Sequence, residues 1–225
     1  MCPRQRSARG SGAQLREEIL VATRELLART GNADAVSIRE VGKLVGVSAP
    51  SIYRHFADKN ALIETAVAQV FENLDTAVVA ATDPGVSPVT RMRDQGMAYV
   101  RFALEHPAQY RVAMAATSDQ GPRAVDLVIG SGAFQRFSHT VREAMDAGTI
   151  TPGDPLPVVL ELWAAAHGVA SLLIAKPYLP FGDAEEFASR VLGATCVGHL
   201  VLDILGGVPE PDEAAQRLAP LRDTE

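Results

Sequence analysis

The side chains best suited to chemistry lie in residues 37–59, where hydroxyl, phenol, imidazole and cationic groups occur close together. Such groups hydrogen-bond to phosphate oxygens and base edges, and small apolar side chains can contact a thymine methyl group. This combination predicts DNA contact rather than catalysis. The predicted DNA-binding residues are Ser37, Arg39, Ser48, Ala49, Pro50, Ser51, Tyr53, Arg54, His55 and Lys59.

Two short helices are expected to position these groups. Ser37 is a favourable N-cap for the first helix, Glu40 can complete a capping box, and Gly46 suits a left-handed stop. Ser48 is expected to cap the second helix, whose first turn tolerates Pro50 because the backbone N–H there is unpaired anyway. Two short helices joined by a glycine turn are typical of a helix-turn-helix, whose second helix enters the DNA major groove.

Structural alternatives accompany these roles. Ser48 is equally suited to capping alone, and Tyr53 could pack beneath the motif. Ile52 and Phe56 are expected in the core. Residues 1–12 contain three arginines and are expected to form a disordered basic arm. Either this arm contacts DNA phosphates or it is disordered without a role in binding.

The same segment resembles the tetracycline-repressor (TetR) family of bacterial transcription regulators. The similarity covers about residues 13–80 and implies a helix-turn-helix head, a helical ligand-binding and dimerisation body, and an inverted-repeat DNA operator as partner. Trp163 and the His167-Gly168 pair, with residues 102–114, are similar to a Trp-His-Gly (WHG) subgroup of C-terminal domains. The residues that carry the first resemblance are Ser37, Gly46-Val47-Ser48, Tyr53-Arg54-His55-Phe56, Lys59 and Leu62.

Charge is distributed unevenly along the 225 residues, whose net charge is −6. Residues 1–59 contain 10 Lys and Arg against 6 Asp and Glu, a net charge of +4. Residues 60–225 contain 11 against 21, a net charge of −10. A basic head on an acidic chain confines attraction for DNA to one region, so overall acidity does not exclude DNA binding.

Helical periodicity and the positions of proline and glycine predict an all-α fold of about nine helices. The expected domains are a helix-turn-helix head at 13–59 (motif 37–57), a connecting helix at 58–81, a ligand-binding and dimerisation body at 82–206, and a partly ordered tail at 207–225. Because the connecting helix is the covalent path between head and body, a signal is expected to pass through it or through contacts with it.

The body offers apolar and aromatic side chains that could line a pocket for a small, largely apolar effector, although each is also an ordinary core residue. His167, in an apolar helix, suits a hydrogen-bonded core position as well as a ligand contact. The candidate pocket residues are Phe102, Tyr110, Met114, Phe134, Phe137, Trp163 and His167.

The last two long apolar helices, at about 156–175 and 183–205, are the expected homodimer interface, with Leu172 and Val201 as its test positions. The first contains Glu161 and His167, which are unfavourable in hydrocarbon, so no membrane span is predicted.

No nucleophile elbow, zinc-protease helix, phosphate-binding loop or dinucleotide glycine motif occurs in the sequence, so neither an enzyme nor a cofactor is predicted. His139 and Glu143 fit a solvated helix face better than half of a metal site, and no metal is predicted. Cys2 and Cys196 are far apart, and no apolar segment follows the N-terminal arginines. A cytoplasmic location with reduced thiols is therefore expected.

Together these features predict a ligand-responsive DNA-binding transcriptional regulator, a homodimeric repressor released from its operator by the effector. The alternative is a helical small-molecule-binding protein whose head pairs with protein rather than DNA.

Overall fold

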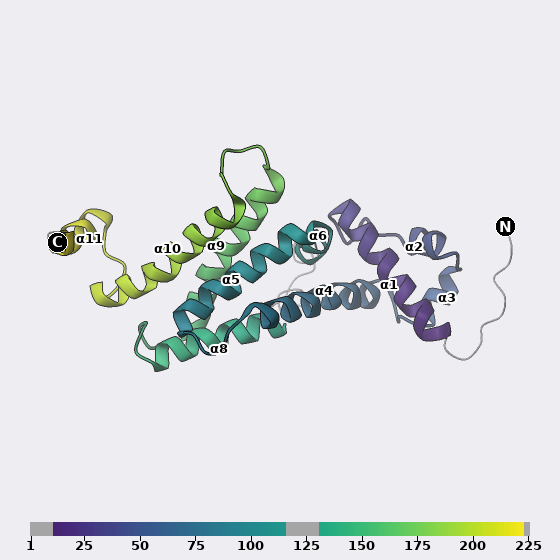
Figure 1. Ribbon diagram of the computed structural model, residues 1–225. Coiled ribbons are helices and arrows are strands. Elements are labelled where there is room, and N and C mark those ends of the chain that lie inside the picture. Colours follow the sequence, from purple (N-terminus) through teal and green to yellow (C-terminus); the bar gives the residue numbers. More distant parts are fainter. Residues whose placement is uncertain (1–10, 116–130, 223–225) are drawn as a thin grey trace. The chain divides into compact units, whose positions relative to one another are not determined.

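The computed structural model describes residues 11–115 and 131–222, and the regular elements there are helices (Figure 1). This confirms the predicted all-α class. The helices are α1 (Ser11–Thr30), α2 (Ile38–Val45), α3 (Ala49–Tyr53), α4 (Lys59–Ala81), α5 (Pro88–Glu105), α6 (Pro107–Ala115), α8 (Gly132–Asp146), α9 (Pro155–Ala175), α10 (Ala184–Leu205) and α11 (Pro211–Leu218), followed by a 3-10 turn at Ala219–Arg222.

Contacts divide the chain into two compact units. The first is drawn from residues 1–76 and 105–134, and the second from residues 77–104 and 135–225. The predicted domain boundaries were placed at motifs and loops rather than at gaps in the packing, so they stay predictions.

The first unit has an apolar core formed by one face of each head helix. Leu20 and Leu27 of α1, Val41 of α2, Ile52 of α3 and Leu62 of α4 are fully buried. Their helical spacing places them on the inner faces of amphipathic helices, where burial of each side chain contributes about 1.5–3 kcal/mol. This core holds the short helix α3, which could not persist alone in water.

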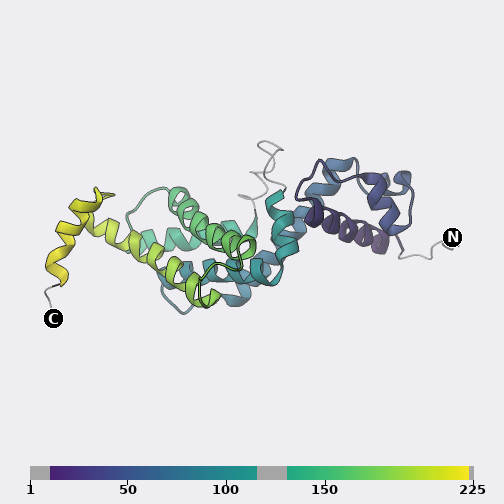
Figure 2. The same cartoon turned by 90° about the horizontal axis from the view of Figure 1, so that it is seen from above.

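In the second unit, α9 and α10 pack side by side, as both ribbon views show (Figures 1 and 2). The first of these helices was expected to begin at about residue 156. Helix α9 begins at Pro155, because the Asp154 side chain accepts a hydrogen bond from the Leu156 N–H and proline is tolerated in a first turn. Asp183 caps α10 in the same way, and Gly206, with φ of 70°, ends it.

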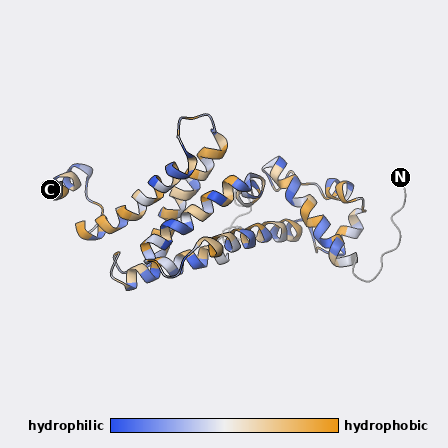
Figure 3. Cartoon of the chain, viewed as in Figure 1, coloured by the Kyte–Doolittle hydropathy of each residue, from blue (hydrophilic) through white to orange (hydrophobic). Residues whose placement is uncertain are grey.

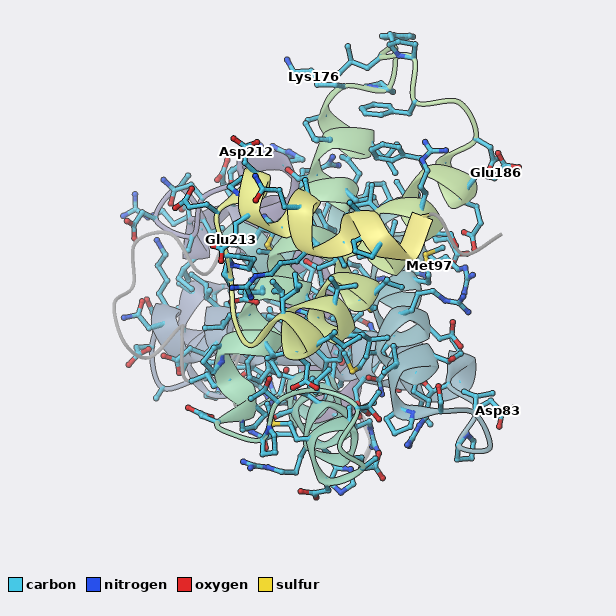
Figure 4. All side chains as sticks on the ribbon, turned by 90° about the vertical axis from the view of Figure 1, so that its left-hand side faces the viewer. Asp83, Met97, Lys176, Glu186, Asp212 and Glu213 are labelled. Carbon is cyan, nitrogen blue, oxygen red and sulfur yellow. The ribbon has the colours of Figure 1, made fainter. Side chains whose placement is uncertain are left out.

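The tail contains an ordered helix, α11, which the sequence reading did not predict. Asp212 and Glu213 project from its first turn (Figure 4). Arg217 donates hydrogen bonds to the Leu205 carbonyl, at 2.9 Å, and to Glu213, at 2.5 Å. These bonds tie α11 to the end of α10.

Candidate nucleic-acid interface

The turn between α2 and α3 depends on two glycines. Ser37 caps α2 as predicted, and its hydroxyl accepts a hydrogen bond from the Arg39 N–H at 3.3 Å. Gly46 ends α2 with φ of 76°, a conformation that favours glycine. Gly42 was missed: a Cβ there would lie 2.7 Å from the Val47 carbonyl oxygen. Only a residue without a side chain lets the turn approach α2 this closely.

Polar groups gather at the exposed start of α3. Ser48 occupies the predicted N-cap position, but its hydroxyl makes no capping hydrogen bond. It lies 3.0 Å from the Ser51 hydroxyl, which in turn accepts from the Arg54 guanidinium at 3.1 Å. The predicted side-chain cap is therefore wrong, because the side chain-to-side chain bond takes its place. The three groups form a cluster of hydrogen-bond donors.

Buried side chains anchor α3 to the core of the first unit. Ile52 is fully buried and Phe56 is 5% exposed, which confirms the core positions predicted for them. The Arg16 guanidinium of α1 lies 5.0 Å from the centre of the Phe56 ring, a cation–π distance. Tyr53, by contrast, is 49% exposed and does not pack beneath the motif. The helix thus presents its phenol outward from a rigid support.

Lys59 has a structural contact that the sequence did not reveal. Its ammonium group donates a hydrogen bond to the Asp34 carbonyl oxygen at 2.8 Å. This bond ties the start of α4 to the loop that precedes α2. A phosphate contact for Lys59 stays a prediction.

A polar network joins α1 to the first half of α4. Arg24 donates hydrogen bonds to Glu17, at 3.0 Å, and to Gln69, whose amide also donates to Glu17 at 3.2 Å. The hydrogen bonds from Arg24 and then Gln69 lower the pKa of the Glu17 carboxyl below its ordinary value. The network therefore favours a charged Glu17 at neutral pH.

Helix α6 packs against α1, a contact that the sequence did not predict. Asn73 of α4 also donates a hydrogen bond to Gln109 of α6 at 3.1 Å. Because α6 follows α5 across the His106-Pro107 junction, it supplies a second route to the head besides the continuous helix α4. Helix α6 reaches the support of α3 through α1, whereas α4 contributes Leu62 to that core directly.

The candidate pocket residues fall in both units. Tyr110, Met114 and Phe134 belong to the first, and Phe102, Phe137, Trp163 and His167 to the second. Phe102, Tyr110 and Phe134 are buried, whereas the other four are partly buried.

His167 belongs to a local cluster of aromatic side chains. Its Nδ1 lies 3.3 Å from the Tyr99 hydroxyl, and its ring centre lies 5.9 Å from that of Trp163. Burial lowers the pKa of the imidazole, which favours the neutral ring.

The other candidate chemical groups are structural. His139 Nδ1 lies 3.8 Å from the Glu143 carboxylate, and residues 11–115 and 131–222 contain no group of three His, Cys, Asp or Glu side chains placed to hold a metal. Cys196 is a buried free thiol whose pKa burial raises to about 11, so it is not a reactive thiolate at neutral pH. Cys2 lies outside the described residues.

Helices α9 and α10 are rich in apolar residues (Figure 3), and several of these side chains are exposed. Both are long and apolar enough to cross a membrane by length and composition alone, a test that core helices of soluble proteins also pass. On α9, Leu156, Leu160 and Leu172 are 37%, 41% and 47% exposed. On α10, Val197 and Ile204 are 53% and 78% exposed.

Comparison with known proteins places both parts of the sequence. Residues 19–66 match the family model for bacterial regulatory proteins of the tetR family, and residues 92–195 match the model for a tetracyclin repressor-like C-terminal domain. The Trp-His-Gly subgroup stays a prediction. A curated relative, the nucleoid occlusion factor SlmA of Vibrio cholerae serotype O1, is 26% identical over 180 residues, which are 76% of this chain and 91% of SlmA.

Solved structures share the fold. A protein of unknown function from Rhodococcus sp. RHA1 matches with a TM-score of 0.67 and 25% identity, over 89% of this chain and all of that one. A TetR-family transcription regulator from Marinobacter aquaeolei VT8 matches with a TM-score of 0.68 and 18% identity, over 84% of this chain and 98% of the other. With the helix-turn-helix, its supporting core and both family models in agreement, the chain belongs to the TetR family of DNA-binding transcription regulators, which are not enzymes.

Proposed function

We propose that this protein is a cytoplasmic, homodimeric repressor that a small, largely apolar effector releases from an inverted-repeat operator. One observation carries the DNA-binding part. Ser48, Tyr53 and Arg54 are exposed and Ser51 is partly buried, and all four lie on or directly beside a helix whose inner residue, Ile52, is fully buried. Donors held on a rigid support can meet phosphates and base edges without a further loss of conformational entropy.

The remaining DNA contacts in the proposal come from the flanks of α3. Ser37 and Arg39 lie at the start of α2, where backbone N–H groups favour a phosphate. Ala49 and Pro50 offer apolar contact to thymine, and His55 lies two residues beyond the end of α3.

The exposed apolar faces of α9 and α10 support a homodimer through these two helices. Leu156, Leu160, Ala164, Gly168 and Leu172 recur every four residues of α9 and so form a ridge that winds slowly around the helix. On α10, Val197 and Val201 are also four residues apart. Exposed surface of this kind is typical of an interaction site in a soluble protein, and a two-fold dimer would cover the same exposed residues on both copies.

The effector is proposed to act on the body and to be sensed by α4 and α6. Helix α6 packs against α1, so a shift of α6 would move the support of α3. Two-fold heads bind successive major grooves only at one spacing. An effector that binds another spacing more tightly would therefore release the DNA, whereas equal affinity for both spacings would shift nothing.

Selection of bound DNA from a random pool tests the DNA-binding and dimer parts together. The expected winners contain an inverted repeat whose half-sites lie about one helical turn apart. Their affinity is expected to fall steeply as the salt concentration rises, because phosphate contacts release counterions. A pool without enrichment would favour the alternative that the head pairs with protein.

The similarity to a nucleoid occlusion factor favours a second candidate, a DNA-binding protein with that role rather than a repressor. Mapping the bound sites along the chromosome separates the two. A repressor is expected at a few sites beside promoters, whereas sites spread over the chromosome without regard to promoters would favour the second role.

A further inference from the structure

One face of α5 carries polar side chains inside the second unit. Arg91, Gln95 and Tyr99 are four residues apart, so they lie above one another on the helix. Each meets a polar group of another helix. The partners are Glu143 and Thr140 of α8 and His167 of α9.

Gln95 leaves one of its two polar atoms without a partner. The side chain is buried, with the residue only 6% exposed, and its amide nitrogen donates to the Thr140 hydroxyl at 3.0 Å. The Thr140 hydroxyl donates its own proton to the Arg136 carbonyl oxygen at 3.1 Å, so it can only accept from Gln95. This fixes the orientation of the amide. The Gln95 Oε1 is therefore the atom without a partner.

Neighbouring groups on α5 and α8 share this condition. Arg91 Nη2 approaches Glu143 Oε2 to 2.8 Å, but the contact is not aligned as a hydrogen bond. Arg91 Nε and Glu143 Oε2 are buried without a hydrogen-bond partner. Across residues 11–115 and 131–222, the buried side-chain nitrogen and oxygen atoms without a hydrogen-bond partner are these two and Gln95 Oε1. The unmet hydrogen-bonding capacity thus belongs to residues of α5 and α8, which contact each other through the Arg91–Glu143 and Gln95–Thr140 pairs.

Unmet capacity of this kind has a chemical meaning. A buried polar atom without a partner is unfavourable, and it persists where a water molecule or a ligand completes its bonds. These residues offer acceptors at Gln95 and Glu143 and a donor at Arg91. A hydroxyl or primary amide group can both donate and accept, so it complements this set, whereas an ether can only accept and a hydrocarbon can do neither.

We propose that Gln95 is a specificity-determining residue of the effector site and that the effector carries a hydroxyl or carboxamide group on an otherwise apolar, uncharged body. Gln95 Oε1 accepts the donor of that group, and Arg91 Nε donates to its oxygen. An uncharged body fits because burial of an unpaired charge is strongly unfavourable. The inference rests on the proposed effector role of the body.

The test compares cyclohexanol with its methyl ether, methoxycyclohexane. Both have the same apolar ring, but only the alcohol can donate. Trp163, the single tryptophan of the chain, reports binding through its fluorescence because it lies in the His167 cluster. We expect the alcohol to bind about tenfold more tightly than the ether to the wild-type protein, the effect of one buried hydrogen bond.

Two variants test whether Gln95 causes the preference for the alcohol over the ether. In Gln95→Met the ratio of the two affinities is expected to fall to about one, while the exposed control Gln216→Met keeps the wild-type ratio. Thermal unfolding checks the fold, and Gln95→Met should be no less stable because it removes an unpaired buried carbonyl. A wild-type ratio of one, or a ratio that survives in Gln95→Met, would overturn the inference and leave an apolar effector site intact. Absence of binding by both compounds would contradict the effector site as well.

Discussion

The helix-turn-helix and the α9–α10 pair differ in how completely a single copy of the chain buries their apolar side chains. In the helix-turn-helix, the inner residues Val41 and Ile52 are fully buried within the unit, and the exposed groups of α3 are mainly polar. In the α9–α10 pair, the shared face is buried, but Leu172, Val197 and Ile204 remain about half exposed or more. One region is complete in a single copy and presents chemistry outward. The other leaves an apolar face that a single copy does not cover.

The difference in exposed apolar surface indicates which kind of partner each region binds. Burial of apolar surface contributes about 25 cal/mol per Å², so an exposed apolar face forgoes stabilisation that a second copy can supply. The exposed polar side chains of α3 lose no stabilisation by facing water, so they are free to bind a polyanion such as DNA. The first region is therefore expected to act through contacts with DNA and the second through contacts with another copy of the chain.

Leu172→Glu is expected to have the largest effect, on the dissociation constant of the dimer. A charge placed in an apolar interface has no partner, so we expect dimer dissociation to increase by more than about hundredfold. Sedimentation across a range of concentrations measures the dissociation constant. Leu179→Glu is the matched control, because Leu179 is similarly exposed but lies in the loop after α9. Dimers of equal strength in both variants would refute the α9–α10 interface, and Val201→Glu provides an independent check of it.

Gly42→Ala should disturb the region that is already complete. The added Cβ would meet the Val47 carbonyl oxygen at 2.7 Å, and relief of such overpacking costs about 1–3 kcal/mol. Urea unfolding measures the loss. Gly12→Ala serves as the control, because a Cβ at Gly12 meets no atom within 4 Å and alanine is favoured in a helix. If Gly42→Ala is as stable as Gly12→Ala, the close turn is not a constraint.

The smallest expected effect is a change in how stability depends on pH, through His167. Burial lowers the pKa of His167 below the ordinary imidazole value of 6.5, so as the pH falls the unfolded chain takes up this proton before the folded one does. The contribution of His167 to stability is therefore complete above pH 6.5 and is lost as the pH falls through that value towards the folded-state pKa. Melting temperatures between about pH 7.5 and 5.5 should fall less in His167→Gln than in the wild type. Identical slopes would show that burial does not hold this imidazole neutral.

Local rules predicted much of the fold. Ser37, Gly46 and the proline of α3 act through neighbours within a few residues, so their sequence spacing was enough to place α2 and α3. Asp154, which caps α9, is also a local signal, and α9 begins at Pro155, next to the expected start at about residue 156.

Other features depend on residues far apart in the chain. The Lys59 bond to Asp34, the packing of α6 on α1 and the contact of Gln95 with Thr140 join helices whose relative placement no local pattern specifies. The sequence shows that Gln95 is polar and four residues from Tyr99, but burial and the missing partner appear only in the folded chain. The DNA-binding residues were proposed from motif position, and the structure adds which of them are held rigidly.

The most direct measurement is the affinity of Tyr53→Ala for the DNA selected from a random pool, at one fixed salt concentration. Tyr178→Ala is the matched control, because Tyr178 is 99% exposed and lies between α9 and α10. Loss of one contact in each half-site should weaken binding by at least about tenfold in Tyr53→Ala, with the dimer and the melting temperature unchanged. Tyr178→Ala should bind like the wild type. If Tyr53→Ala also binds like the wild type, α3 is not the recognition helix and the central claim fails.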